Sequence, residues 1–326
     1  MSVPSCSLSI MVARTDLPFL MHTVPHLVKA CHFPFVERVL FVDTAPLSGD
    51  KVKRPGIGTL EDLRDCCATL RDRGLIDRIV DMDYRPEVRE RLYRKHLGLP
   101  FPQTHNWKGY PIFGTIYSLE AIAGDYLVHF DSDMLLHQRA DHDWISAGIA
   151  RLQQHPQILA MRPMTGPPRR DGDGTMAQGN QPDRDPAGFY YSDFFGSRVY
   201  LIDRRRFDEL LPLPIRWRKT RHRWYNGLPT PLRTRLNYWT GKGELDSWEW
   251  MVTDQFRRRG AVRAWDATAA AWTVHPNTRS PQFLAALPQI IEQVEKGHYP
   301  PEQIGHYDLQ VDAWITWLGS QPEINA

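Results

Sequence analysis

The first half of the chain alternates between short apolar runs and segments with helical spacing. Apolar runs of strand length occupy residues 8–13, 36–42, 76–80, 126–130 and 158–162. Helical patterns or helix end signals separate them, with one segment around Pro25 and others at 59–73, 86–96 and 114–123. Strands that alternate with helices form βαβ units with right-handed crossovers. The pattern therefore predicts an α/β fold with a doubly wound, mostly parallel sheet flanked by helices.

The second half of the chain changes character after residue 162. Residues 163–193 are rich in Gly, Pro, Asp and Arg and show no apolar period, which is typical of a long functional loop. Strand patterns return at 197–202 and 271–274, and helical patterns at 246–259, 281–296 and 302–318. We divide the chain into a continuous Rossmann-like half at 1–162, an elaborated half of the same domain at 163–280, and a helical extension at 281–326.

The most informative motif is a buried strand that ends in two acids. The apolar run 126–130 is followed directly by Asp131, Ser132 and Asp133. In an open α/β sheet, ligands bind beyond the carboxyl ends of the strands, so these acids are expected at the binding edge. Two neighbouring carboxylates repel, and a divalent cation with oxygen ligands relieves the repulsion. The motif predicts a site for Mg²⁺ or Mn²⁺.

Other Asp-x-Asp pairs are present, and their positions distinguish them from this one. They lie at 81 and 83, 141 and 143, 171 and 173, and 183 and 185. Asp141 and Asp143 precede an apolar helical series, as expected at a helix N-terminus. The pairs between 171 and 185 lie in the loop without an apolar period. Asp81 and Asp83 follow a credible strand and are the real competitor, but we favour Asp131 and Asp133.

Three further acids or bases are candidates for chemistry, each with an ordinary structural alternative. Asp43 ends the second strand, where it can accept hydrogen bonds from a nucleobase or ribose hydroxyl, or simply start a turn. Glu249 near the start of a helix can act as a general base, or can form a capping box with Asp246. His275 ends a late strand before Pro276, where it is either a metal ligand or an ordinary core residue.

The order of these features resembles the GT-A glycosyltransferases, most closely those of the family 2 type. The similarity runs from about residue 8 to residue 276 and rests chiefly on the strand ending in Asp131 and Asp133. It implies a glycosyltransferase of the hexosyltransferase class that binds a nucleotide-diphosphate sugar in its first half. It also implies that Asp131, Asp133 and His275 hold Mn²⁺ or Mg²⁺ on the diphosphate, and that Glu249 is the base of an inverting reaction. The donor-binding positions implied are Ala13, Arg14, Asp43, Asp131 and Ser132.

Two positions depart from the pattern of that family. Thr44 follows Asp43 where the family usually has a second acid, and Trp248 precedes Glu249 where the late helix usually begins Glu-Asp. Asp254 is therefore an alternative base. A sugar nucleotidyltransferase on a related fold is a competing interpretation, although residues 13–18 lack the glycine-rich phosphate loop that such enzymes have after the first strand.

A basic and aromatic segment at 204–235 contains ten arginines and lysines together with Trp217, Trp224 and Tyr225. It can close over the donor diphosphate through an arginine such as Arg218 or Arg221. It can instead bind an acidic or lipid-phosphate acceptor at a membrane surface. A third interpretation is a solvated loop whose tryptophans pack on the sheet. If this segment were the functional part, the protein would be a non-catalytic module that binds anionic surfaces.

Composition bears on three other classes of protein: nucleic-acid-binding, disulfide-rich or zinc-binding, and membrane-spanning proteins. The 326 residues carry a formal net charge of +2, which gives no reason to expect nucleic acid as a partner. Four cysteines without a C-x-x-C pair or histidine partners indicate neither a disulfide framework nor a zinc module. The first 14 residues lack a basic n-region, and no apolar run approaches the length of a membrane span. We expect a cytoplasmic protein with possible peripheral membrane contact; the donor's base and sugar, the acceptor and the oligomeric state stay open.

Overall fold

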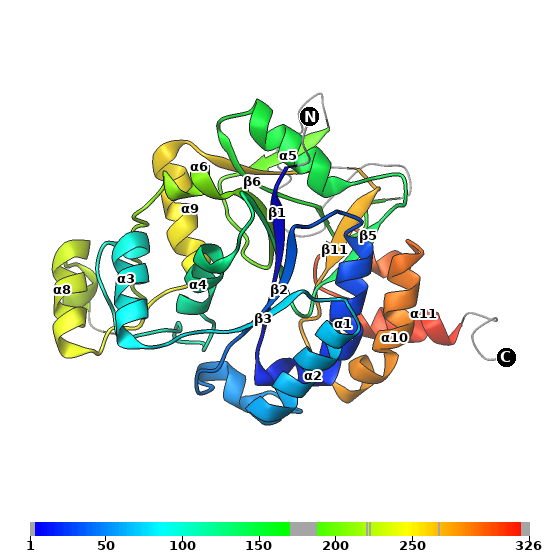
Figure 1. Cartoon of the computed structure of the whole chain (residues 1–326), viewed down its shortest axis with the longest axis horizontal. Helices are drawn as coiled ribbons and strands as arrows, with labels where there is room; N and C mark the ends of the chain where they lie inside the picture. The colour runs from blue at the N-terminus through cyan, green and yellow to red at the C-terminus, as the bar shows by residue number, and fades with distance from the viewer. Residues whose placement is uncertain (1–3, 170–187, 220, 222, 267, 321–326) are drawn as a thin grey trace.

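The computed structural model describes residues 4–169, 188–219, 221, 223–266 and 268–320. The described residues form a mixed α/β fold, in which a large and mostly parallel sheet is flanked by helices on both faces (Figure 1). This confirms the predicted fold class. The Asp-x-Asp pairs between 171 and 185 and the final residues 321–326 lie outside the described residues.

The large sheet crosses the whole domain. Its eight described strands lie in the order β3 (Arg78–Asp81), β2 (Glu37–Val42), β1 (Cys6–Val12), β4 (Tyr126–Asp131), β9 (Val199–Asp203), β6 (Ile158–Arg162), β10 (Val262–Asp266) and β8 (Phe189–Ser192). The pairs from β3 to β4 and the pair β6–β10 are parallel, whereas β9 is antiparallel to both β4 and β6.

The insertion of β9 differs from the expected continuous layer through residue 162. Its apolar residues 199–202 are all buried, as expected for a central strand covered on both faces. A strand from the second half of the chain therefore separates β4 from β6. It runs against them, so its N-terminal end lies at the edge of the sheet where β4 ends.

Two hydrophobic clusters cover the two faces of this sheet. On one face, alternate residues of β1 pack against α1 (Leu17–Ala30), α2 (Leu60–Asp72) and α5 (Trp144–Gln154). On the other face, α3 (Pro86–Leu97), α4 (Phe113–Ala121) and α9 (Trp248–Arg259) pack against β2 and β9 (Figure 1). Side chains alternate between faces along a strand, so β2 contributes Leu40 and Val42 to one cluster and Val39 and Phe41 to the other.

Several helix ends agree with the sequence signals. The Thr59 hydroxyl accepts a hydrogen bond from the Asp62 backbone N–H at 3.0 Å, and the Asp62 carboxylate accepts one from the Thr59 N–H at 2.8 Å. Asp143 caps α5 by accepting from the backbone of Ile145 and Ser146. Gly98 ends α3 with φ +77°, in the left-handed region that glycine adopts without strain. These local predictions are confirmed.

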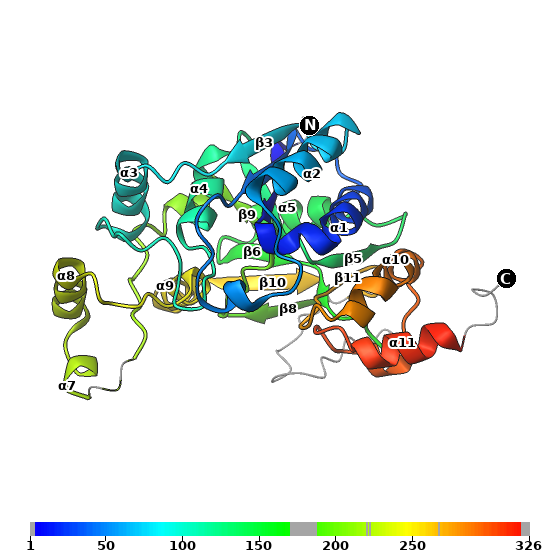
Figure 2. The same ribbon diagram turned by 90° about the horizontal axis from the view of Figure 1, so that it is seen from below.

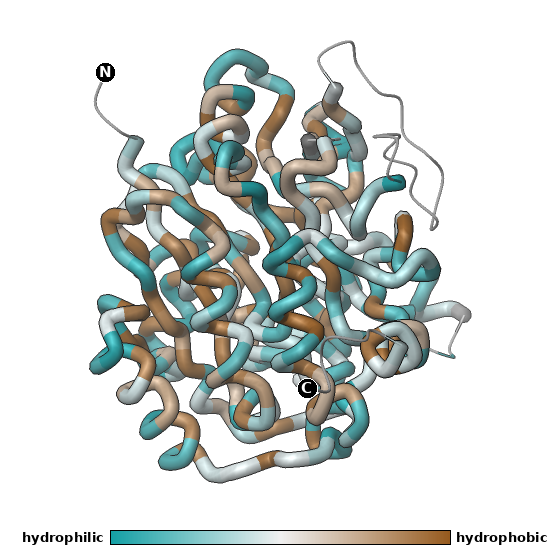
Figure 3. The backbone as a smooth tube through the Cα atoms, turned by 90° about the vertical axis from the view of Figure 1, so that its right-hand side faces the viewer, coloured by the Kyte–Doolittle hydropathy of each residue, from teal (hydrophilic) through white to brown (hydrophobic). Residues whose placement is uncertain are grey.

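A smaller sheet lies beside the first, on the side of the C-terminal helices. It consists of β5 (Leu135–Gln138), β11 (Ala271–Val274) and β7 (Met164–Thr165). The helices α10 (Pro281–Glu295) and α11 (Val311–Gly319) pack on it around the buried Trp272 and Trp314. Hydrophobic and hydrophilic positions alternate along the helices on this side (Figure 3), as expected for helices that bury one face.

The predicted single helix at 302–318 is wrong. The chain instead forms a short 3₁₀ turn, η3 (Pro301–Gln303), and then an irregular segment before α11 begins. Gly305 in this segment has φ +71°, and the Gln303 side chain accepts hydrogen bonds from the Gln310 backbone and the Trp314 indole. The irregular segment carries Tyr307 to the edge of the large sheet, where its ring lies beside Arg162 and Arg198.

The basic segment 204–235 is not one solvated loop in its described residues. It contains α6 (Arg204–Asp208), α7 (Arg223–Asn226) and the start of α8 (Thr230–Thr240), and the last two project from one end of the molecule (Figures 1 and 2). Trp217 is buried against Phe101, with ring centroids 5.5 Å apart, as the third interpretation expected of a tryptophan. Trp224 is exposed. Within the described residues, no helix combines the length and the apolar character needed to cross a bilayer.

Candidate active site

Two cavities adjoin each other at the C-terminal ends of β1 and β4. The first has a volume of about 260 Å³ and is lined by Asp43, Asp133 and His275, among others. The second has a volume of about 720 Å³ and is lined by Glu249. Asp131 and Arg198 line both cavities. The site predicted from widely separated segments is therefore brought together at this edge of the sheet.

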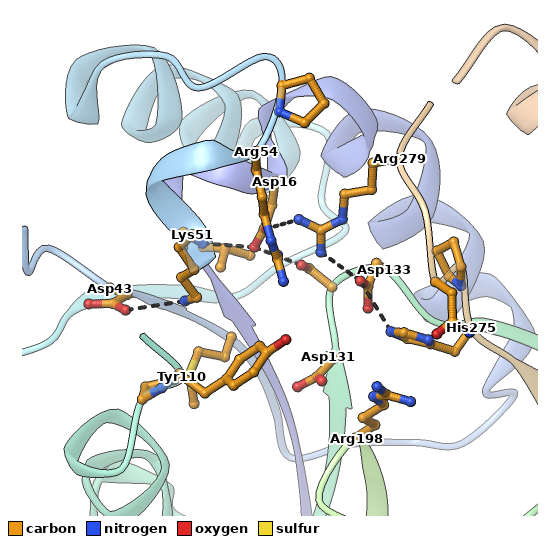
Figure 4. Close-up of a pocket in the computed structure, with 18 residues that line it drawn as sticks. Asp16, Asp43, Lys51, Arg54, Tyr110, Asp131, Asp133, Arg198, His275 and Arg279 are labelled. Atoms are coloured by element: carbon orange, nitrogen blue, oxygen red, sulfur yellow. Dashed lines mark hydrogen bonds and ion pairs between the residues drawn. The ribbon is translucent and has the colours of Figure 1, made fainter. Parts of the chain in front are cut away.

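Asp133 and His275 face each other inside the first cavity. The His275 Nε2 lies 3.5 Å from Asp133 Oδ2, and the Arg279 Nη2 donates to the same oxygen at 2.6 Å (Figure 4). All three side chains are largely buried. Arg279, four residues after His275 and before α10, was not identified from the sequence. Because Arg279 lies in a loop and not at the end of a strand, no sequence pattern pointed to it.

The charges of this trio support one another. Burial alone would raise the pKa of the Asp133 carboxyl, but His275 and Arg279 outweigh it and hold the pKa well below its usual range. Burial alone would lower the pKa of His275, but the Asp133 carboxylate outweighs it and raises the pKa. The cavity therefore holds an ionised Asp133 carboxylate between the His275 ring and the Arg279 guanidinium.

Asp131 and Ser132 reach the site through the end of β4. The Asp131 carboxylate is 44% exposed towards the cavities, and the His129 Nε2 lies 3.4 Å from its Oδ1. The buried Ser132 hydroxyl donates to Asp16 Oδ2 at 2.9 Å instead of facing solvent. Ser132 thus joins the β4 edge to the segment after β1.

Asp16 is a site residue that the sequence interpretation missed. Its carboxylate accepts hydrogen bonds from the Ala13 backbone and the Thr15 hydroxyl at 2.9 Å, and lies 3.5 Å from Arg279. It stands directly before α1, where an Asp is a common cap, and that was the available signal. Of the two predicted donor-binding residues here, Ala13 lines the first cavity, whereas Arg14 lines neither cavity.

Asp43 is buried in the wall of the first cavity. Its Oδ1 accepts from the Tyr84 hydroxyl at 2.7 Å and the Ala45 N–H at 3.1 Å, and its Oδ2 lies 3.1 Å from His105 Nε2 and 3.8 Å from Lys51 Nζ. Burial alone would raise the pKa of Asp43, but the His105 hydrogen bond and the Lys51 charge outweigh it and lower the pKa to about 2. The carboxylate is therefore ionised and largely hydrogen-bonded within the protein.

Further cationic side chains line the same cavity. Lys51 lies in the 3₁₀ turn η2 (Gly49–Lys53), and Arg54 follows this turn with its guanidinium 5.9 Å from the Tyr110 ring (Figure 4). Neither Lys51 nor Arg54 was identified from the sequence. With Arg198 and Arg279, these residues give the first cavity four cationic side chains around its carboxylates.

Glu249 lies in the first turn of α9 and faces the second cavity. Its Oε2 accepts from the Ser197 N–H at 2.9 Å and from the Ser197 hydroxyl at 3.1 Å. The cap of α9 is Ser247, whose hydroxyl accepts from the Trp250 N–H. The alternative capping box between Asp246 and Glu249 is therefore wrong, because the helix begins one residue later than that pattern required.

The neighbours of Glu249 have different roles. Trp248 is buried against Phe195 in the core at the wall of the cavity, whereas Trp250 is only partly buried and lines the cavity beside Glu249. Asp254, the alternative base, lines neither cavity and accepts two hydrogen bonds from Arg216 Nη1 at 3.1 Å. Among the two acids of α9 considered as a base, only Glu249 has access to a cavity.

A two-residue segment connects the acids of the two cavities. The Asp131 backbone N–H donates to the Arg198 carbonyl at 2.8 Å, and the preceding residue, Ser197, donates to Glu249. Arg198 also lies beside Tyr307, with its guanidinium carbon 5.8 Å from the ring centroid. The two residues directly before β9 therefore fix the position of Glu249 relative to Asp131.

The competing residues lie elsewhere. Asp81 pairs with Arg64, Asp83 pairs with Arg85, and neither acid lines a cavity described here. Arg218 pairs with Glu244 at 2.9 Å and is also absent from both linings. Arg221 is exposed on the projecting segment. In this conformation, neither Arg218 nor Arg221 closes over the first cavity.

The predicted metal ligands fit a divalent cation in part. Within the described residues, no three His, Cys, Asp or Glu groups stand close enough to enclose a metal. Asp133 and His275 are already adjacent, and Asp131 opens into the same cavity. Mg²⁺ and similar cations use one or two carboxylates together with water and substrate phosphates, so an incomplete protein cage suits them. Arg279 occupies Asp133 Oδ2, which leaves Oδ1 as the available oxygen.

Comparison with solved structures gives likenesses of fold. GalNAc-T7 with UDP, GalNAc and Mn²⁺ is 14% identical with a TM-score of 0.47, over 84% of this chain and 44% of that chain. The mannosyltransferase PcManGT from Pyrobaculum calidifontis, in complex with GDP-Man and Mn²⁺, is 12% identical with a TM-score of 0.37, over 66% of this chain and 48% of that chain. This chain thus spans less than half the length of either.

The resemblance to GT-A glycosyltransferases, and to family 2 among them, stays an expectation from the sequence. No model of a protein family and no curated protein matches the sequence.

Proposed function

We propose that this protein is a metal-dependent glycosyltransferase that moves a sugar from a nucleotide-diphosphate sugar to an acceptor hydroxyl with inversion. The observation that carries the proposal is the pair of adjoining cavities. One combines Asp131, Asp133 and His275 with cationic side chains, and the other presents Glu249. An acidic and cationic pocket suits a diphosphate with a metal ion, and an accessible carboxylate suits a base.

The donor diphosphate occupies the first cavity in this proposal. Lys51, Arg54 and Arg198 are placed to neutralise phosphate oxygens, and arginine binds them in bidentate fashion. Asp131, Asp133 and His275 would hold Mn²⁺ or Mg²⁺, which would supply Lewis-acid stabilisation of charge on the leaving diphosphate. Asp43 uses about three of the roughly four acceptor positions of a carboxylate, so one stays available to a nucleoside N–H or hydroxyl.

The transfer itself is a single displacement. The Glu249 carboxylate takes the proton of the acceptor hydroxyl while that oxygen attacks the anomeric carbon. The bond from this carbon to the diphosphate oxygen breaks at the same time, and the leaving nucleotide takes its electron pair. Attack from the opposite face inverts the anomeric centre. Ser197 holds Glu249 Oε2 through two hydrogen bonds, which orients the carboxylate with Oε1 available as the base.

A thermal-shift screen tests this proposal on the full chain. The ligands are the UDP, GDP, CDP and dTDP sugars, each with and without Mn²⁺. A ligand at a hundred times its Kd adds about 2.7 kcal/mol of stability, which such a screen detects readily. We expect metal-dependent stabilisation by one nucleotide sugar, and its base identifies the donor. Absence of a response to all of them contradicts the proposal.

The sugar nucleotidyltransferase alternative has less support. The segment after β1 forms the 3₁₀ turn η1 (Arg14–Asp16) and contains no glycine. Asp16 accepts the Ala13 N–H in this turn, so a carboxylate occupies the place where a phosphate loop would present backbone donors. Stabilisation by a nucleoside triphosphate and a sugar phosphate, without any response to nucleotide sugars, is the result that would favour this alternative.

Peripheral membrane contact through α7 and α8 is a second proposal. Trp224, Trp239, Tyr238 and Leu232 are exposed together on this projecting part, and the Arg235 guanidinium lies 4.7 Å from the Trp239 ring centroid. Arginine interleaved with tryptophan suits the headgroup region of an anionic bilayer. A purely anionic-surface-binding module would bind such vesicles with steep salt dependence and without any response to nucleotide sugars or metal.

A further inference from the structure

Two buried arginines stand beside Glu249 in the wall of the second cavity. Arg162 ends β6 and Arg263 lies in the neighbouring β10; they are 4% and 6% exposed, and both line this cavity. The Nη1 atoms of Arg263 and Arg162 lie 2.5 and 3.6 Å from the place where a Cβ on Gly196 would be. The two guanidinium groups are therefore neighbours, next to the Ser197 that holds Glu249.

Two of the three nitrogens of the Arg263 guanidinium lack acceptors. Its Nε and Nη1 are buried without any hydrogen-bond partner. Burial and, to a smaller extent, the charge of Arg162 lower the pKa of Arg263 to about 9. The lowered pKa shows that the charged form of Arg263 is destabilised at this buried position. No carboxylate among the described residues forms an ion pair with either arginine at 4.0 Å or less. Unpaired buried donors and charges are costly and are normally satisfied by a partner.

Both side chains are nevertheless held in place. Arg162 donates to the Thr273 hydroxyl and the Pro163 carbonyl at 3.2 Å, and its guanidinium carbon lies 4.7 Å from the Tyr307 ring centroid. The Arg263 guanidinium carbon lies 5.4 Å from the Trp265 ring centroid and 5.8 Å from that of Phe194. Aromatic rings fix the guanidinium plane without using its N–H groups. The donors are thus prearranged for an acceptor that enters the cavity.

We propose that Arg162 and Arg263 bind an anionic group of the acceptor, a carboxylate or a phosphate, beside the hydroxyl that Glu249 activates. The inference rests on the proposed transferase function and specifies its acceptor. Paired guanidinium groups match the oxygens of either anion in bidentate geometry. Gly196 keeps the space in front of them open, because a side chain there would collide with Arg263 Nη1.

The donor diphosphate is a less suitable occupant of this pair. Arg162 and Arg263 line only the second cavity, whereas the first cavity has its own cations in Lys51, Arg54 and Arg279. Among the cationic side chains that line the two cavities in the described part of the chain, Arg198 alone borders both. The arginine pair therefore lies on the acceptor side of the shared wall.

Calorimetric titration of the full chain, without nucleotide or metal, tests the inference. The probes are inorganic phosphate, glucuronate and neutral methyl glucoside. We expect at least one anion to bind and the neutral glycoside not to bind. Arg263→Met weakens anion binding at least tenfold and raises the Tm in the absence of anion, because it removes an unpaired buried charge. Arg258→Gln, on the exposed end of α9, is the matched control and leaves both quantities unchanged.

The outcomes separate the sources of the anion and the possible sites. Binding of phosphate alone indicates a phosphorylated acceptor, and binding of glucuronate alone indicates an acidic sugar. Binding that persists in Arg263→Met and is lost in Arg54→Gln belongs to the first cavity and overturns the inference, as does the absence of anion binding. If Arg263→Met does not fold, the same tenfold criterion is applied to Arg162→Gln.

The same variants distinguish failure of this inference from failure of the proposed function. Stabilisation by a nucleotide sugar with Mn²⁺ depends on the first cavity, so we expect it to persist in Arg263→Met. A wild-type protein that responds to nucleotide sugars but not to anions overturns the acceptor inference alone. A wild-type protein that binds anions through Arg263 without any response to nucleotide sugars contradicts the transferase function and leaves the anion site standing.

Discussion

Replacement of Glu249 by glutamine removes the proposed base with little change of shape. The Glu249 Oε2 accepts two hydrogen bonds from Ser197, at 2.9 and 3.1 Å, and the amide oxygen of glutamine can accept both. The loss to folding is then the charge assistance of these bonds, about 1 kcal/mol in all. For a chain of this size, that corresponds to a fall in Tm of roughly 2 °C. Glu249→Gln is therefore expected to stay folded and to bind the donor normally.

The effect on turnover is expected to be much larger. General-base assistance contributes about 10²–10⁴ in rate. At about 1.36 kcal/mol for each factor of ten, this is about 3 to 5 kcal/mol of activation free energy. An amide cannot take up the proton of the acceptor hydroxyl, so kcat falls by that factor while the Kd of the nucleotide sugar is unchanged. The expected pattern is a loss of turnover out of proportion to the loss of stability.

The assay combines initial rates with donor binding by calorimetry, once the thermal-shift screen has identified the donor. Asp254→Asn is the matched control, since Asp254 lies on the same helix, pairs with Arg216 and lines neither cavity. Its turnover should stay near that of the wild type. The reasoning is refuted if Glu249→Gln retains full turnover, or if Asp254→Asn loses turnover and Glu249→Gln does not. Loss of donor binding in Glu249→Gln would assign this residue a structural role.

Three other outcomes are expected. Asp133→Ala abolishes metal-dependent stabilisation by the nucleotide sugar in a thermal shift, whereas Asp83→Ala, outside both cavities, does not. Equal responses would contradict the metal site. The folded-state pKa of Asp43, about 2, is below its ordinary 3.8, so its ionised form stabilises the protein above pH 4 and this contribution is lost as pH falls through about 2. Asp43→Asn should accordingly remove about 2 kcal/mol of stability at pH 6 but little near pH 2, as urea unfolding measures. Trp239→Ala should weaken sedimentation with phosphatidylserine vesicles, and unchanged sedimentation would exclude this membrane surface.

The strands and the acids at their ends were predictable because local patterns carry them. An apolar run followed by Asp131 and Asp133 predicts both a strand and its exposed end. Thr59 and Asp143 were correctly read as helix caps, because their bonding partners lie within three residues. The predicted capping box at Asp246 was wrong because local pattern alone cannot choose between two adjacent caps. Asp246 and Ser247 are neighbours, and both residue types make good caps.

The remaining site residues could not be found in this way. The position of β9 between β4 and β6 depends on pairing between strands far apart in sequence, and no local pattern encodes it. Arg279 and Tyr307 come from irregular segments, where periodicity gives no signal. Arg263 occurs in an ordinary strand, and its importance arises only because the fold buries it beside Arg162 without an acceptor. Functional arrangements of this kind become visible only when the tertiary contacts are known.

The antiparallel direction of β9 has a consequence for which residues of this molecule tolerate change. The distance between Glu249 and Asp131 must stay constant, whereas the residues that precede Ser197 can vary. The two residues directly before β9, Ser197 and Arg198, set the distance between Glu249 and Asp131, because Ser197 donates to Glu249 and the Arg198 carbonyl accepts from the Asp131 N–H. Insertions or exchanges in the preceding loop can therefore reshape the acceptor pocket without changing that distance. Exchanges before Phe195 are expected to change the proposed acceptor cavity, whereas a single-residue insertion between Ser197 and Val199 would displace the proposed base from Asp131 and abolish the proposed transfer.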